Sequence, residues 1–361
     1  MVVYENIISE YQNPLKIDKE QIREYLWRVF EYHLSHTPYW KKQRSKFNLE
    51  EIFEGSLEEI FEKIFNQGLF VEEEYLRNNW LEFLPENYNG KIRFYQSSGT
   101  TGERAIGHWD YEYVKVLVKY LKLSFDEVYK LNEKYDEKHK MRAIAHGPYG
   151  WYQEEISELV WSYSGLLYFI GFETDGIKRE LYEKGLEYLL RGRLAPLVKY
   201  TRRVLEKDKI NTIRSAPPLL DLFLHQLENI ETIILSGLEI TIQYLKELQE
   251  EFPNGTIIPL YGHYAFGDLV GMVKNNDIVY YPNYPFTIAL PLVKEDNGYR
   301  VVKYRERGKM ALVIARPEIL IIKIENEEIT RIPPTKPFAW DGFANPKRGG
   351  LDGKLPANRD V

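Results

Sequence analysis

The chain contains 361 residues, of which 44% are hydrophobic and 28% are charged, as is usual for a soluble globular protein. This length allows a large core and favours more than one structural unit. A formal net charge of −6 argues against nucleic-acid binding as the main activity. Because the sequence has no cysteine, disulfides, thiolate zinc sites and a cysteine nucleophile are excluded.

The sequence predicts neither a membrane span nor an export signal. It has no apolar run of about 18 residues, the length that a membrane-spanning helix requires. Residues 1–20 contain Glu, Asn, Gln and Asp and lack the basic-then-apolar pattern of a signal peptide. We therefore expect a cytoplasmic protein that does not bind membranes.

The pattern from Lys19 to Leu76 is mostly helical. Its first helix has apolar residues at i, i+3, i+4, i+7 and i+8 spacing, which marks one buried face. These residues are Ile22, Tyr25, Leu26, Val29 and Phe30. Pro38 ends this helix, because proline and the residue before it resist helical geometry. A second helix is predicted over Leu57–Phe65.

Strands and helices alternate through the middle of the chain. The predicted strands are Ile92–Tyr95, Ala143–Ala145, Ile210–Ser215, Glu231–Leu235 and Thr256–Tyr261. The predicted helices are Tyr111–Val128, Glu155–Leu167, Gly176–Leu205, Pro218–Leu227 and Thr241–Glu251. Short connections between alternating elements indicate parallel βαβ units packed in layers.

After Gly271 the pattern changes to short β runs separated by turn residues. These runs are Ile278–Tyr281, Phe286–Leu290, Tyr299–Tyr304, Met310–Ile314 and Ile319–Ile324. They predict a small antiparallel sheet or barrel. Residues 333–361 are rich in Pro, Gly, Lys, Asn and Asp with little periodicity, so we expect an irregular tail.

The most specific motif is Ser97-Ser98-Gly99-Thr100-Thr101-Gly102, which follows a predicted strand. Its glycines allow backbone geometries that other residues resist. Four hydroxyl side chains and the surrounding backbone N–H groups favour a flexible cradle for polyphosphate. It is not a Walker loop, because no Gly-Lys-Ser/Thr follows at the required spacing. A plain turn or linker is the alternative interpretation.

This loop resembles the phosphate-binding loop of adenylate-forming enzymes, the superfamily of acyl-CoA synthetases, luciferases and peptide-synthetase adenylation domains. The overall pattern is most similar to the phenylacetate–CoA ligase branch. The resemblance implies an α/β fold of layered βαβ subdomains with a small antiparallel β subdomain. The resemblance also implies a large adenylation-type domain (1–330), which consists of a helical part (1–90), an α/β core (91–270) and the β subdomain (271–330). Residues 331–361 would be the irregular tail, with the family's C-terminal lid domain absent.

Two further segments are similar to the family's nucleotide-binding motifs. Gly237-Leu238-Glu239 follows a predicted strand and resembles the segment beside the adenine, although an ordinary strand–turn–helix junction remains the alternative. Tyr261-Gly262-His263-Tyr264 resembles the Tyr-Gly-x-Ser/Thr-Glu motif, which implies that Tyr261 packs on adenine and that His263 is a catalytic candidate. A strand running into a glycine-rich turn is the alternative there.

The resemblance also places a substrate pocket. Ser215-Ala216-Pro217 is similar to a segment that lines the acyl pocket in the family, although it also suits a turn into a helix start. Tyr149 and Trp151 lie in a Tyr-Gly-rich loop like that of phenylacetate–CoA ligases, where rings pack on a flat acyl group. Tyr264 would complete the pocket, and core packing is the alternative for any single ring.

Glu328 stands near the position where the family has an aspartate that binds the ribose, although it also suits a charged strand end. The family's Mg²⁺ ligand is replaced by Ala265, whose side chain supplies no oxygen. A metal site would therefore need Asp268 or Glu239. This departure puts Mg²⁺-assisted chemistry in doubt, while ATP or AMP remains the implied nucleotide.

Two functions stay open. One is an ATP-dependent ligase that forms an acyl-adenylate from a small carboxylate and transfers the acyl group to a thiol, amine or protein. In that enzyme Thr100 and Arg104 would act at the phosphates, with Arg104 replacing lost positive charge. The other is a catalytically impaired nucleotide-binding or scaffold protein. A homodimer is compatible with either.

Overall fold

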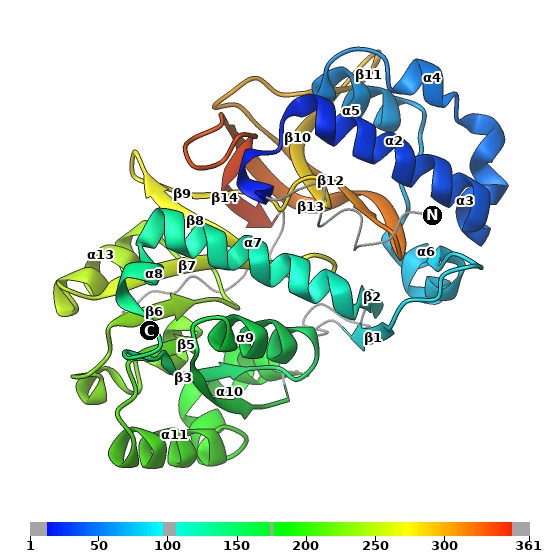
Figure 1. Cartoon of the computed structure of the whole chain (residues 1–361). Coiled ribbons are helices and arrows are strands. Elements are labelled where there is room, and N and C mark those ends of the chain that lie inside the picture. Colours follow the sequence, from blue (N-terminus) through cyan, green and yellow to red (C-terminus); the bar gives the residue numbers. More distant parts are fainter. Residues whose placement is uncertain (1–12, 97–105, 174–175, 349–361) are drawn as a thin grey trace. The chain divides into compact units, whose positions relative to one another are not determined.

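The computed structural model describes residues 13–96, 106–173 and 176–348, which fold into two compact units. The first unit consists of residues 13–94, 106–116 and 279–348. The second consists of residues 95–96, 117–173 and 176–278. The N-terminal helices and the C-terminal strands therefore form one unit, and the chain changes unit within a helix, α7, and within a strand, β9 (Figure 1).

The first unit begins with helices, as predicted. A capping box at Asp18 starts α2 (Lys19–His36), and α3 begins at Pro38, where the sequence predicts a break. The second predicted helix is confirmed as α5 (Leu57–Asn66). The other elements are η1 (Pro14–Lys16), α3 (Pro38–Gln43), η2 (Arg44–Lys46), α4 (Leu49–Ile52), α6 (Glu73–Asn78) and η3 (Trp80–Phe83).

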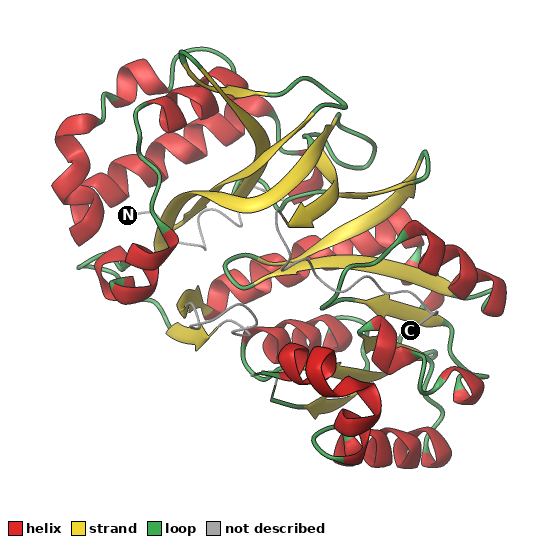
Figure 2. Cartoon of the chain, turned by 180° about the vertical axis from the view of Figure 1, so that it is seen from behind, coloured by secondary structure: helices red, strands yellow, loops and turns green. Residues whose placement is uncertain are grey.

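These helices pack on an antiparallel sheet with strand order β11-β10-β12-β13-β14-β9. Figure 2 shows the helices in red against the yellow strands. The Tyr25 hydroxyl of α2 donates to Ala315 O at 2.8 Å, and Trp40 Nε1 donates to Leu320 O at 2.9 Å. The strands are β9 (Asp277–Tyr280), β10 (Thr287–Glu295), β11 (Gly298–Val301), β12 (Arg307–Arg316), β13 (Ile319–Ile332) and β14 (Gly342–Arg348).

Part of the predicted irregular tail is a strand. β14 pairs with β13, where Ile332 lies opposite Gly342, and with β9, where Phe343 lies opposite Tyr280. The prediction of irregular structure is therefore wrong for Gly342–Arg348. Its Gly, Asn and Pro residues disfavour a strand locally, but two neighbouring strands supply the pairing.

The edge strand β11 is covered by side chains of α5. Glu62 Oε1 accepts the N–H of Val301 at 2.8 Å, and Asn66 accepts the N–H of Tyr299. The Asn66 amide also donates to Tyr299 O at 3.0 Å. The outward backbone groups of β11 at these two residues thus have partners within the chain.

The second unit holds the parallel sheet that the alternating pattern predicts. Its order is β8-β7-β6-β5-β3-β4, with β7 through β4 parallel and β8 antiparallel to β7. The strands are β3 (Arg142–Gly147), β4 (Leu166–Gly171), β5 (Thr212–Ser215), β6 (Thr232–Leu235), β7 (Thr256–His263) and β8 (Gly267–Lys274). The α/β class is confirmed.

Helices flank this sheet, and α9 contacts β3 and β4 (Figure 1). The elements are α7 (Tyr111–Tyr129), α8 (Leu131–Lys134), α9 (Trp151–Trp161), α10 (Ile177–Arg191), α11 (Ala195–Lys207), α12 (Pro217–Leu220), η4 (Leu224–Gln226) and α13 (Ile242–Glu251). Among the described residues, no helix is long and apolar enough to cross a membrane.

Several details of the second unit differ from the prediction. The helix predicted to reach Leu167 ends at Trp161, and a turn with Ser164 at φ +54° leads into β4. The strands β4 and β8 were not predicted, and the predicted helix Gly176–Leu205 is divided into α10 and α11 at Gly192. The helix predicted over Pro218–Leu227 is instead the short α12 followed by η4. Each error falls where an apolar run reads equally well as helix or strand, or where glycine and proline interrupt it.

Candidate functional site

The parallel strands of the second unit end at one edge of their sheet, which we call the carboxyl edge. β3 ends at Gly147, β5 at Ser215 and β6 at Leu235. Open α/β folds bind ligands at such an edge, beyond the carboxyl ends of the strands. The segments predicted to bind nucleotide and acyl group follow these strands directly.

The predicted phosphate loop, Ser97–Gly102, and Arg104 lie outside the described residues, so their roles, including that of Thr100, stay predictions. The strand expected before the loop is confirmed as β1 (Ile92–Gln96). A further strand, β2 (Ile106–Asp110), pairs with β1 before α7 begins. The loop therefore connects two paired strands.

The segments Ser215–Pro217 and Gly237–Glu239 lie side by side at the carboxyl edge. The N–H of Ser236 donates to Ser215 O at 3.2 Å. Gly237 has a φ of +91°, and a Cβ at this position would lie 3.9 Å from that of Ala216. Glycine suits this backbone conformation, which strains other residues. The structure thus brings the predicted adenine-binding segment against the predicted pocket segment.

The Tyr-Gly segment, Tyr261–Tyr264, lies where β7 turns into β8. Tyr261 is only 6% exposed, and its ring stacks with that of Phe266 at a centroid distance of 6.4 Å. His263 also stacks with Phe266, at 4.5 Å, and its Nδ1 accepts the N–H of Ala265 at 3.2 Å. The ring of Tyr264 lies 4.7 Å from that of His263. This segment is an aromatic cluster held by a local hydrogen bond.

Gly262 connects this segment to the predicted aromatic pocket. A Cβ at Gly262 would lie 2.5 Å from Oδ1 of Asp268 and 3.9 Å from the Trp151 ring. Since real Cβ contacts are longer than 2.5 Å, a side chain here would displace the Asp268 carboxylate. Tyr149 is 60% exposed, and its ring lies 5.9 Å from that of Phe169. Trp151 is therefore near the Tyr-Gly segment, while Tyr149 projects toward solvent.

A buried ion cluster of Arg214, Glu155 and Asp268 lies next to Gly262. Arg214 donates to Glu155 Oε1 at 3.0 Å and pairs with Asp268, and all three side chains are at most 1% exposed. The N–H of Asp268 donates to Glu155 Oε2 at 3.1 Å. The ring of Tyr152 lies 4.0 Å from the guanidinium. One guanidinium thus faces two carboxylates, and burial raises the pKa of Glu155 to about 7 against the opposing effect of Arg214.

This cluster bears on the predicted metal site. The carboxylate of Asp268 is paired with Arg214, and Ala265 offers no ligand atom. Glu239 is half-buried. Within residues 13–96, 106–173 and 176–348, no group of three or more His, Asp or Glu side chains is placed to hold a metal ion. The metal role predicted for Asp268 therefore competes with its ion pair to Arg214.

His146 organises the strand ends next to this cluster. Thr201 donates its hydroxyl to Leu197 O at 2.8 Å, so its oxygen accepts from His146 Nε2 at 2.9 Å. Nδ1 of His146 then accepts the Ser215 hydroxyl at 2.9 Å. Burial lowers the pKa of His146 to about 4, so the ring is neutral at pH 7. The histidine joins β3, β5 and α11.

Glu328, the predicted ribose ligand, belongs to the first unit and lies on β13. Its carboxylate is 3.6 Å from Arg307 Nε and 3.6 Å from Lys309 Nζ, both on the neighbouring strand β12. These pairs are half-exposed and weak. The ribose contact stays a prediction.

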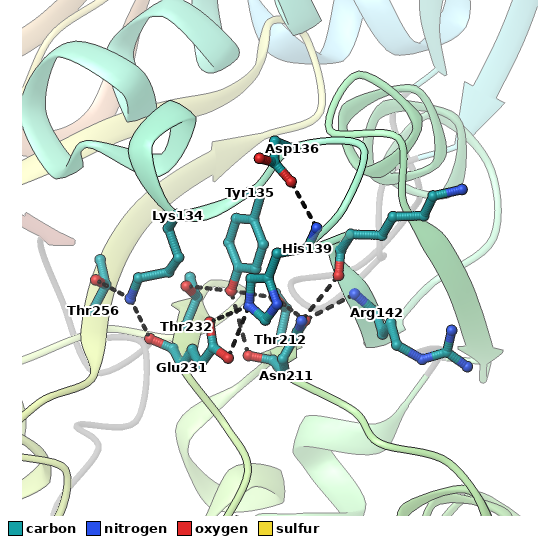
Figure 3. Close-up of polar contacts among 11 residues, drawn as sticks. Lys134, Tyr135, Asp136, His139, Arg142, Asn211, Thr212, Glu231, Thr232 and Thr256 are labelled. Carbon is teal, nitrogen blue, oxygen red and sulfur yellow. Dashed lines mark hydrogen bonds and ion pairs between the residues drawn. The ribbon is translucent and has the colours of Figure 1, made fainter.

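The opposite edge of the parallel strands carries a second polar group, which we call the amino-edge network (Figure 3). The Tyr135 hydroxyl lies 2.9 Å from Thr212 Oγ1 and 2.8 Å from Thr232 Oγ1. Lys134 Nζ donates to Glu231 O at 3.0 Å and to Thr256 Oγ1 at 2.9 Å. These contacts join the first residues of β5, β6 and β7.

The rest of the amino-edge network follows the same pattern. Asn211 Oδ1 accepts the N–H of Arg142 at 2.8 Å, and its amide donates to Lys140 O at 3.0 Å (Figure 3). His139 Nε2 lies 2.9 Å from the nearer carboxylate oxygen of Glu231. The polar groups of this edge form hydrogen bonds with one another, so the network links the amino ends of neighbouring strands and stabilises the sheet.

Sequence reasoning missed the ion cluster, although a signal was present. Arg214 is a cation within the predicted strand Ile210–Ser215, and a charge in a buried strand requires a carboxylate partner. Glu155 shares the buried face of α9 with Ile156 and Leu159. Both residues therefore contradicted the apolar pattern around them.

No protein-family model and no curated protein matches the chain. Solved structures show that its fold is that of the adenylate-forming enzymes. A 2-hydroxyisobutyryl-CoA ligase in an open conformation with 2-HIB-AMP and CoA is similar over 91% of this chain and 73% of its own, with 12% identity and a TM-score of 0.65.

The same ligase is similar in other states. In the thioesterification state with 2-HIB-AMP and CoA, 90% of this chain matches at 13% identity and a TM-score of 0.63. In the postadenylation state with 2-HIB-AMP, 90% matches at 14% identity and a TM-score of 0.61. The chain covers 66% of the ligase in both structures. At these identities the likeness concerns the fold.

Proposed function

We propose that this chain uses ATP to activate a carboxylate as an acyl-adenylate and then transfers the acyl group to a thiol, amine or protein acceptor. The observation that supports the proposal is that Gly237 lies beside Ala216 where β6 and β5 end, with Tyr261 near the end of the adjoining strand β7, in a fold shared with a ligase whose structure contains an acyl-AMP. We also propose that the chain belongs to the phenylacetate–CoA ligase branch, because its Tyr149–Trp151 loop resembles that of these ligases.

The proposed chemistry needs positioning more than covalent catalysis. A carboxylate oxygen attacks the α-phosphorus of ATP, and the bond to pyrophosphate breaks. The acceptor then attacks the acyl carbon, and AMP leaves. Tyr261 would pack on adenine, and Ser97–Gly102 would hold the phosphates, with Arg104 supplying positive charge. His263 is the proposed catalytic histidine, and its Nδ1 accepts the Ala265 N–H, so that a neutral ring would carry its proton on Nε2.

The pairing of Asp268 with Arg214 favours a second candidate. If Asp268 is unavailable and no other carboxylate holds Mg²⁺, the carboxyl edge would bind nucleotide without forming an adenylate. The chain would then be a nucleotide-binding protein on an adenylation fold. Glu239 is the remaining carboxylate of the predicted segments.

Carboxylate-dependent exchange between ATP and pyrophosphate separates the two functions. A panel of aromatic and short aliphatic acids, each with and without Mg²⁺, should give exchange with at least one acid. Absence of exchange at high enzyme concentration, with AMP binding still detected by calorimetry, would establish the second candidate. Absence of both would refute nucleotide binding.

A matched pair of variants connects the activity to the carboxyl edge. Tyr261→Leu keeps an apolar side chain but removes the aromatic ring, so we expect about tenfold weaker AMP binding. Tyr182→Ala alters a tyrosine of α10 that is 82% exposed and should change nothing. Equal AMP affinity in both variants would contradict the role proposed for Tyr261.

A further inference from the structure

Helix α11 has two faces of opposite chemistry. Leu197, Thr201 and Val204 are buried. Lys199 and Arg203 follow Leu197 and Thr201 by two residues, which places them about 200° around the axis, on the outer side. Both are exposed, as are Arg202 and Lys207. The outer side of α11 is thus a stripe of cations, which we call the basic face.

The basic face has no charge partner in the described part of the chain. None of Lys199, Arg202, Arg203 and Lys207 forms an ion pair within residues 13–96, 106–173 and 176–348. By contrast, the neighbouring Arg191 and Arg193 pair with glutamates. Glu206 is the one acidic residue in the sequence of α11. Four cations therefore face solvent with little compensation.

The same helix also reaches the carboxyl edge. On its inner side, Thr201 accepts the Nε2–H of His146, which in turn accepts the Ser215 hydroxyl. Because an α-helix with its side chains is about 10–12 Å across, the basic face lies roughly one helix diameter from the proposed acyl pocket. A partner bound to this face would stand next to the site where the acyl group is transferred.

An aromatic ring accompanies the cations. Tyr200 is 46% exposed and lies between Lys199 and the two arginines in sequence. Tyrosine and arginine are enriched at protein interfaces and among the residues that dominate binding free energy. An exposed helix face that combines them offers both electrostatic attraction and apolar contact area.

We propose that the basic face of α11 binds an acidic protein that presents the acyl acceptor. The acceptor role rests on the proposed function, whereas the binding itself does not. Charge complementarity selects an acidic surface, and an extended stripe over two helical turns suits a protein element. The exposed Tyr200 ring between the cations adds apolar contact area, which favours a protein surface as the polyanion.

The test uses the full chain and a fluorescein-labelled, glutamate-rich helical peptide as the probe. The variant Lys199→Glu/Arg203→Glu reverses the two central charges of the basic face. The matched control Lys138→Glu/Lys140→Glu reverses two exposed lysines in the α8–β3 connection, at the amino edge. We expect peptide affinity to fall at least tenfold in the first variant at low salt and to change less than twofold in the control.

Two results would overturn the proposal. Equal weakening in both variants would show that only net charge matters. Tighter binding of a duplex DNA or of CoA than of the peptide, abolished by the same Lys199→Glu/Arg203→Glu change, would assign the basic face to a different polyanion. Carboxylate-dependent pyrophosphate exchange should remain unchanged in both variants, so loss of peptide binding with intact exchange separates this proposal from the proposed function.

Discussion

Replacing Glu155 by Gln tests the charge balance of the buried ion cluster. Arg214 faces two carboxylates there, so one negative charge is uncompensated among the three side chains. Glu155→Gln removes this charge. One of the two hydrogen bonds accepted by Glu155 is lost as well, which costs about 1 kcal/mol at every pH. Because this loss does not depend on pH, the pH dependence of the unfolding free energy reports the effect of the charge alone.

The sign and size of the effect follow from the pKa. Burial raises the pKa of Glu155 from 4.5 to about 7, so the folded protein holds this proton more tightly than the unfolded chain. The stabilisation of the folded state by this bound proton is fully present below about pH 4.5 and is lost as the pH rises through 7. At pH 8 the loss is about 3 kcal/mol, since each pKa unit corresponds to about 1.4 kcal/mol.

Urea unfolding at pH 5, 6, 7 and 8 measures this directly. Relative to the wild type, Glu155→Gln should gain about 2–3 kcal/mol in unfolding free energy between pH 5 and pH 8. The control Glu250→Gln alters an exposed glutamate of α13 and should run parallel to the wild type. Parallel curves for Glu155→Gln as well would refute the reasoning, because they would mean that Glu155 is ionised at all four pH values.

Three other substitutions probe the two edges of the sheet. Thr201→Val removes the acceptor of the His146 Nε2–H and should cost about 1–3 kcal/mol in urea unfolding; an unchanged midpoint would show that the ring finds another acceptor. Tyr135→Phe removes the central hydroxyl of the amino-edge network and should lower the thermal midpoint, and wild-type stability would contradict its fastening role. Gly262→Ala should weaken AMP binding by displacing Asp268, so full affinity in calorimetry would disprove that the Tyr-Gly segment requires this glycine.

The regular parts of the fold could be predicted because their signals are local. The 3.6-residue periodicity of α2 and the break at Pro38 both follow from the sequence of a single segment. The alternation of elements likewise predicted the parallel sheet of the second unit. Elements whose stability depends on distant partners could not be found this way. β14 contains Gly, Asn and Pro, and it is a strand because β13 and β9 pair with it.

The candidate site shows the same division. The strand ends that carry Gly237 and Tyr261 were located from apolar runs followed by glycine. The ion cluster was not, because Arg214 is separated from Glu155 by 59 residues and from Asp268 by 54. Only the folded topology brings these charges together. The motif comparison therefore proposed Asp268 as a metal ligand, whereas the structure gives its carboxylate to an arginine.

The cover over β11 has a consequence for handling the protein at high concentration. A bare edge strand is a template on which another molecule can add a strand and begin to aggregate. Glu62 and Asn66 accept hydrogen bonds from the outward N–H groups of Val301 and Tyr299, so these groups are not available to pair with an added strand. Replacing both residues by alanine would expose these amide groups, so we expect such a variant to aggregate more readily than the wild type at high concentration.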